Sequence, residues 1–123
     1  MTRSRASAKK AGSSFERQIA DYLAMALKDD RIDRRVKTGN ADKGDIGGLR
    51  HMGHRLVIEC KNTSRTNLGG WAGEAEAERI NDAALAALTV HKRHGKGQAD
   101  QQWVTLTLGD LVALLTGDRS HYE

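Results

Sequence analysis

The sequence has few of the residues on which several classes of protein depend. Cys60 is the single cysteine among 123 residues, so the chain cannot form an internal disulfide, and no repeated Cys pairs indicate a structural zinc site. No segment reaches the roughly 18 apolar residues of a membrane span, and the N-terminus lacks the apolar centre of a signal peptide. We therefore expect a cytoplasmic protein with no membrane segment and no redox function.

Aromatic residues are also scarce: the chain has two Trp, two Tyr and one Phe. With 38% hydrophobic residues, the core must be built mainly from Ala, Leu, Val and Ile, which suits an α/β layer structure. The length fits one domain. We predict a disordered basic arm over residues 1–12 and a single domain over residues 13–123.

Positive charge is concentrated in the first half of the chain. Residues 1–65 carry 15 Lys or Arg against 8 Asp or Glu, whereas residues 66–123 carry 5 against 8. This bias indicates a polyanionic partner such as nucleic acid, although a basic surface that only keeps the protein in solution would look the same. The residues that we predict to contact DNA are Arg3, Arg5, Lys9, Lys10, Arg34, Arg35, Lys37, Arg65, Lys92 and Arg93.

Hydrophobic periodicity and turn residues predict the order α-β-β-β-α-β-β-α. The expected elements are helices over 13–28, 71–87 and 108–115 and strands over 32–36, 45–51, 55–61, 88–93 and 102–107. Gly47 and Gly48 interrupt the strand over 45–51.

The segment LVIECK, residues 56–61, ends an apolar strand with two charges. Side chains alternate along a strand, so Glu59 and Lys61 share one face with Val57. A salt bridge at a sheet edge would explain the pair, but a strand so apolar on both faces is normally covered, and its charges then border a cleft. If the preceding strand pairs with this one, Asp45 meets Glu59, and a divalent cation would relieve their repulsion.

Glu16, Gly44-Asp45-Ile46 and Glu59-Cys60-Lys61 together resemble the signature of the PD-(D/E)XK nuclease superfamily. The resemblance covers residues 13–108 and implies a restriction-endonuclease-like αβββαβ core, with a central mixed sheet flanked by helices. The basic segments at 34–39 and 90–93 are most similar to those of Holliday junction resolvases of phage or archaeal type.

The resemblance implies a homodimeric, structure-specific DNA endonuclease that takes part in recombination and repair. Asp45, Glu59 and the backbone carbonyl of Cys60 would bind Mg²⁺, for which Mn²⁺ could substitute. Lys61 would position the attacking water, and Glu16 would bind a second metal or orient water. A RecB-like exonuclease, a restriction-type nuclease and a non-catalytic nucleic-acid-binding domain remain alternatives.

Several of these residues have a second explanation. Gly44 stands where the family pattern has proline, which makes Asp42 a rival ligand. Glu16 follows Ser13 by three residues, as in a capping box that closes a helix N-terminus. Trp71 could stack a base or anchor its helix. Zinc is a weak alternative, for which the sequence offers Cys60 and the pairs His51/His54 and His91/His94.

Overall fold

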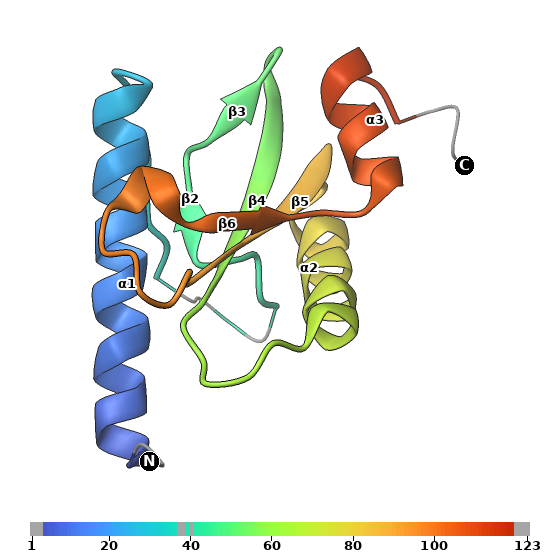
Figure 1. The fold of residues 1–123 in the computed structure, drawn as a ribbon. Helices are drawn as coiled ribbons and strands as arrows, with labels where there is room; N and C mark the ends of the chain where they lie inside the picture. The colour runs from blue at the N-terminus through green and yellow to red at the C-terminus, as the bar shows by residue number, and fades with distance from the viewer. Residues whose placement is uncertain (1–3, 37–38, 40, 120–123) are drawn as a thin grey trace.

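In the described part of the chain, three α-helices flank a mixed sheet of six strands, which is an α/β fold (Figure 1). The computed structural model describes residues 4–36, 39 and 41–119, so Arg3 and Lys37, two of the predicted DNA contacts, lie outside the described residues. None of the described helices combines the length and the apolar character that crossing a membrane requires. The elements are α1 (Arg5–Ala26), β1 (Asp33–Arg34), β2 (Ile46–Gly47), β3 (Arg50–His51), β4 (His54–Lys61), α2 (Leu68–Asp82), β5 (Ala86–His91), the 3₁₀-helix η1 (Ala99–Gln101), β6 (Trp103–Thr105) and α3 (Leu108–Thr116).

The sheet has the strand order β1-β2-β4-β5-β6, and β3 pairs with β4 beside this path. β4 and β5 run parallel, with Leu56 opposite Ala86 and Lys61 opposite His91. The other pairs are antiparallel, including β2 with β4, where Ile46 faces Ile58. The parallel pair needs a crossover connection, and α2 supplies it. The strand after Asp45 pairs with the strand that carries Glu59, which is the condition on which the expected meeting of these two acids depends.

The two faces of β4 are covered by different helices, on opposite sides of the sheet in Figure 1. Ile58 and Cys60 point into the larger core together with Phe15 and Ile19 of α1. Val57 points the other way, into a small cluster with alanines of α2 and β5. The predicted alternation is confirmed, and it places Glu59 and Lys61 on the face that α2 covers.

The predicted disordered arm, residues 1–12, is helical from residue 5 on, because residues 5–12 form the first turns of α1; residues 1–3 lie outside the described residues. Ser4 caps the helix by accepting a hydrogen bond from the Ser7 N–H at 3.1 Å. Residues 4–10 are exposed, and Phe15 is the first buried residue. The Ala, Lys and Arg residues of this segment are good helix formers, so they extend a helix that is nucleated where Phe15 packs.

The second helix is shorter than predicted, and the following strand is correspondingly earlier. α2 ends at Asp82, and Ala83 adopts the left-handed conformation with φ of 50° and ψ of 45°. Ala84 is buried, and Ala87 belongs to β5 opposite Val57. Alanine favours helices, but here pairing with β4 and burial in the core outweigh that preference.

A glycine divides the second predicted strand, residues 45–51, into β2 and β3. Gly48 has a φ of +87°, and a Cβ at this position would lie 2.2 Å from the carbonyl oxygen of Arg31. Only glycine tolerates this conformation and this approach, so the chain turns here instead of continuing as one strand.

Candidate functional site

The loop before β2 brings Asp45 to β4 by a close backbone approach. Gly44 has a φ of +97°, and a Cβ there would lie 2.9 Å from Val57 Cγ1. The Asp45 N–H donates to the carbonyl of Ile58 at 2.9 Å, and its Oδ2 accepts the Cys60 N–H at 2.7 Å. Proline fixes φ near −65°, so it could not occupy position 44. Glycine is therefore the residue that this loop geometry needs at position 44.

An acid that the sequence analysis missed, Glu78 of α2, lies close to Glu59 of β4. Both residues are buried, with exposed fractions of 4% and 6%. Among the described residues, neither of their Oε2 atoms has a hydrogen-bond partner. Asp42 joins them: one carboxylate oxygen from each of the three residues lies within 4.8 Å of the other two. We call Asp42, Asp45, Glu59 and Glu78 the acidic cluster.

The acidic cluster is electrostatically strained when no cation is present. Burial raises the pKa of Asp45 to about 7, and the neighbouring Glu59 carboxyl acts in the same direction. Burial, together with the contact to Glu78, raises the pKa of Glu59 to about 9. Burial also raises the pKa of Glu78. Carboxyls that share a buried space retain protons because two adjacent negative charges there are costly.

Lys61 lies beside the cluster and is held by a second residue that the sequence analysis missed. Its Nζ is 4.0 Å from Glu59 Oε1 and 2.5 Å from Glu74 Oε2. Burial lowers the pKa of Lys61, but the hydrogen bond to Glu74 and the charge of Glu59 outweigh it, so the net pKa is raised. The ammonium group therefore stays charged. Glu74 and Glu78 are four residues apart, and this spacing on a predicted helix is the signal that could have identified both.

Glu16 is placed in the interior of α1, so the capping box that we considered for it is wrong. Ser4, not Ser13, caps the helix. Glu16 Oε1 accepts from the Arg34 guanidinium at 3.2 Å. Burial and then the charge of Asp45 raise the pKa of Glu16, whereas Arg34 lowers it. Glu16 thus borders the acidic cluster, with a cation at its side.

Arg35, which we predicted to contact DNA, forms an ion pair and a hydrogen bond within the protein. Its Nη1 lies 3.1 Å from Asp82 Oδ1 at the end of α2 and donates to the Lys43 carbonyl at 3.0 Å. Asn81 donates to the Asp42 carbonyl at 2.8 Å. These contacts connect the end of α2 to the loop that carries two acids of the cluster. Arg35 therefore helps to hold this loop against α2, and a DNA contact by Arg35 stays a prediction.

Cys60 and the histidines do not form a zinc site among the described residues, whose one metal-competent group contains only carboxylates. Burial raises the pKa of Cys60 above its ordinary value, so its thiol stays protonated. His91 Nε2 forms a hydrogen bond of 2.7 Å with Thr105 Oγ1. The centroid of the His91 ring lies 5.1 Å from that of the Trp71 ring. Trp71 is 7% exposed, which confirms a packing role.

The other predicted DNA contacts lie at three places on the surface. Arg5, Lys9 and Lys10 are exposed on the first turns of α1, and Arg65 is exposed in the loop before α2. Lys92 Nζ donates to the Lys96 carbonyl. Arg93 lies over the ring of Trp103, with its Cζ 4.4 Å from the ring centroid. None of these residues belongs to the acidic cluster.

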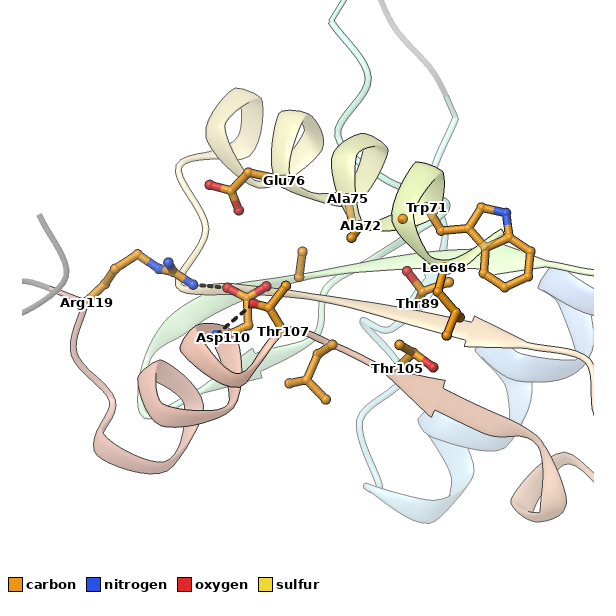
Figure 2. A pocket seen from close by; sticks show the side chains of 13 residues that line it. Leu68, Trp71, Ala72, Ala75, Glu76, Thr89, Thr105, Thr107, Asp110 and Arg119 are labelled. Carbon is orange, nitrogen blue, oxygen red and sulfur yellow. Dashed lines mark hydrogen bonds and ion pairs between the residues drawn. The ribbon is translucent and has the colours of Figure 1, made fainter. Parts of the chain in front are cut away.

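A cavity of about 550 Å³ is lined by residues of α2, β5, β6 and α3 (Figure 2). Leu68 and Trp71 border one end, and the ion pair between Asp110 and Arg119 borders the other (Figure 2). Its lining is mainly apolar and contains none of the clustered acids. Among the described residues, the group of carboxylates that could hold a metal ion therefore lies outside this cavity.

The arrangement can bind a hard cation beside a fixed ammonium group. Carboxylate oxygens are the ligands that Mg²⁺ and Mn²⁺ prefer, and the unpaired Oε2 atoms of Glu59 and Glu78 fit that use. Asp45 is oriented by the Cys60 N–H; a metal role for the Cys60 carbonyl stays a prediction. Comparisons of the chain with protein-family models, with curated proteins and with solved structures found no match.

Proposed function

We propose that this chain is a metal-dependent DNA endonuclease that hydrolyses phosphodiester bonds in branched DNA, with four-way junctions as the preferred substrate. One observation carries the proposal: buried carboxylates with unpaired oxygens converge beside the ammonium group of Lys61. A solvent-exposed acid cluster would need no cation, but burial makes the uncompensated charges costly. The sheet and its helices suit a restriction-endonuclease-like core, which is part of the same proposal.

The metal would be held by oxygens of Glu59, Glu78 and Asp42, with Asp45 as the neighbouring ligand. When bound, Mg²⁺ or Mn²⁺ would supply Lewis-acid activation of the phosphate and lower the pKa of a coordinated water. The protein supplies the orientation. Cys60 fixes the Asp45 carboxylate, and the backbone of β4 fixes the spacing between Glu59 and Lys61.

Lys61 is suited to stabilise the charge that develops on the phosphate. Its side chain is 19% exposed and is held by Glu74 from α2. In a partly dehydrated site, a fixed cation of this kind lowers the energy of an anionic transition state more than it would in water. Glu16, paired with Arg34, is the remaining acid that could orient water.

The choice of junction DNA depends on symmetry and charge. A junction has two strands to cut symmetrically, and a homodimer would present two active sites related by a two-fold axis. The exposed basic residues of α1 would contact the phosphate backbone.

Cleavage assays with variants of the acids test the proposal. Asp45→Asn and Glu59→Gln should reduce Mg²⁺-dependent cleavage of a four-way junction by about 100-fold or more, because each removes charge from the metal site. Asp21→Asn is the matched control, because Asp21 is an exposed acid of α1 paired with Arg17. Binding of the same junction in Ca²⁺ or chelator should be unchanged or tighter for the site variants.

The alternatives predict different results in the same assay. If the wild-type protein cuts no junction, duplex, flap or single strand in Mg²⁺ or Mn²⁺, the chain is a binding domain without catalysis. If it cuts single strands or linear duplex better than junctions, the exonuclease or restriction-type alternative is correct. Calorimetry that detects no uptake of Mn²⁺ by the wild-type protein would overturn the metal site itself.

A further inference from the structure

One row of residues crosses the sheet from the candidate active site to the opposite edge. In the strand register, Lys61 of β4 is opposite His91 of β5, and His91 is opposite Trp103 of β6. Residues that are paired across neighbouring strands point to the same face. Strands lie about 4.8 Å apart, so the backbone of Trp103 is roughly 10 Å from that of Lys61. This is a short distance on the scale of a nucleotide chain.

The middle of this row is packed against α2, and its end at Trp103 is exposed. Trp71 of α2 packs against His91, which also contacts Thr105 by a hydrogen bond of 2.7 Å. Trp103 is 48% exposed although it is one of the largest apolar side chains in the protein. Lys61 lies at the other end, beside the acids. An exposed aromatic ring is therefore held at a fixed offset from the candidate metal site.

A cation lies over the exposed ring. The Cζ atom of Arg93 is 4.4 Å from the centroid of the Trp103 ring. Within the part of the chain that the structure describes, Arg93 forms no ion pair with a carboxylate. Residues 91–96, HKRHGK, contain no acid, so the end of β5 and the turn after it carry only positive charge, although Asp100 of η1 lies three residues before Trp103. This charge complements a phosphate backbone and would repel a cationic partner.

The side chain of Gln102 holds the backbone next to Trp103 and Arg93 in place. Gln102, which is 8% exposed, accepts the Arg93 N–H at 2.7 Å. Its Nε2 donates to the carbonyls of Lys96 and Gln98 at 3.0 and 2.7 Å. The side chain of Gln102 thus connects the end of β5, the following turn and the start of β6. A platform fixed in this way loses little conformational entropy when a ligand binds.

From these observations, and resting on the nuclease function proposed above, the geometry points to Trp103 and Arg93 as a binding site for one unpaired nucleotide of the DNA substrate. The base stacks on the indole, and the adjoining phosphate contacts the guanidinium group. Aromatic side chains bind bases of any sequence in this way, but only where the base is not already stacked in a duplex. The substrate class is therefore DNA that has an unpaired nucleotide next to the cleaved bond, which a four-way junction offers only when a base pair at its branch point opens.

Binding measurements in chelator test this site without depending on cleavage. For a labelled single strand of thymidines, Trp103→Leu should weaken binding roughly tenfold, and Trp103→Phe should recover most of the loss. Affinity for a blunt duplex of the same length should change less than about twofold. Val104→Ala is the matched control, because Val104 is also exposed on β6 but points to the opposite face. The single strand should also quench tryptophan fluorescence in the wild type but not in Trp103→Phe.

Each other result overturns the site. If Trp103→Leu leaves single-strand affinity unchanged, or weakens strand and duplex equally, no base stacks on the ring. If Trp103→Leu converts a dimer to a monomer in sedimentation and leaves single-strand affinity unchanged, the ring is a contact between two copies of the chain. The binding measurements are made in chelator and so do not depend on a metal. If the protein shows the expected binding pattern but never cleaves DNA, the nucleotide site is supported and the proposed nuclease function is wrong. If the protein cleaves DNA but Trp103→Leu does not change single-strand affinity, only the nuclease function is supported.

Discussion

Asp45 and Glu59 retain protons at a pH where free carboxyls are ionised. Their raised pKa values, about 7 and about 9, come first from burial and then from neighbouring carboxyls. The unfolded chain has neither burial nor fixed neighbours, so both groups titrate there near pH 4. Over the interval between these values, the folded protein binds more protons than the unfolded chain does. The stability of the metal-free protein must therefore depend on pH.

This difference in bound protons determines whether the free energy of unfolding rises or falls with pH. In chelator, we expect the free energy of unfolding to fall as the pH rises from about 5 to about 9, because the folded state must give up protons that it holds favourably. Saturating Mg²⁺ should flatten this fall, since a cation favours the ionised carboxylates. Thermal melting with and without Mg²⁺ measures both effects, at roughly 5 °C in Tm for each kcal/mol.

A variant without the titrating groups is the control for this pH dependence. The double variant Asp45→Asn/Glu59→Gln should melt with a smaller dependence on pH, because amides do not titrate in this range. Asp21→Asn should behave as the wild type does, since Asp21 is exposed on α1. A wild-type Tm that rises between about pH 5 and about pH 9 in chelator would contradict the burial of these acids.

The sequence identified the site acids on or next to the strands, but it did not identify those on α2. Asp45 and Glu59 could be recognised because strand alternation and pairing imply that they meet. Glu78 could not be placed by the same reasoning, because its contact depends on the rotation of α2 against the sheet. For Gly44, the required φ is set by the approach to Val57, which the sequence does not display.

The boundary of α2 shows how tertiary contacts determine where an element ends. The run of alanines after Asp82 favours a longer helix, yet the chain leaves the helix at Ala83. The Ala83 N–H still bonds to the Arg79 and Ile80 carbonyls, as in an ordinary helix C-terminus. Ala84 and Ala87 then enter the core beside Val57. Local propensity was correct for the helix and wrong for its end.

Ala83→Gly should stabilise the protein without affecting the site. Alanine at a φ of 50° is strained, whereas glycine adopts the left-handed conformation readily. Ala83 is exposed, so the substitution removes no buried contact. We expect a gain of about 0.5–1 kcal/mol in the free energy of unfolding, measured by urea denaturation.

A glycine placed inside α2 is the control for this substitution. Ala77→Gly should destabilise the protein by about 1 kcal/mol, because the helix interior has no need of a left-handed residue. If Ala83→Gly destabilised the protein by a similar amount, residue 83 would belong to the helix in solution, as the sequence had predicted.

Part of the positive charge of the first half of the chain lies on the N-terminal turns of α1. The basic residues of the first turns, Arg5, Lys9 and Lys10, lie on a helical segment that extends beyond the sheet in Figure 1. This segment buries no side chain before Phe15, so the fold gains little stability from residues 4–10. Under the proposed function, a basic helical extension of this kind is suited to contact phosphates at a distance from the cleaved bond.

Deleting residues 1–10 should therefore separate DNA affinity from stability. The free energy of unfolding should change by less than about 1 kcal/mol, because residues 4–10 are exposed. Junction affinity should fall, and the slope of log K against log[salt] should decrease by roughly 0.9 for each phosphate that the shortened protein no longer neutralises. Lys9→Gln/Lys10→Gln keeps the helix and should reproduce part of this decrease. An unchanged salt slope in both proteins would mean that the DNA lies elsewhere, and that the positive charge of α1 only keeps the protein in solution.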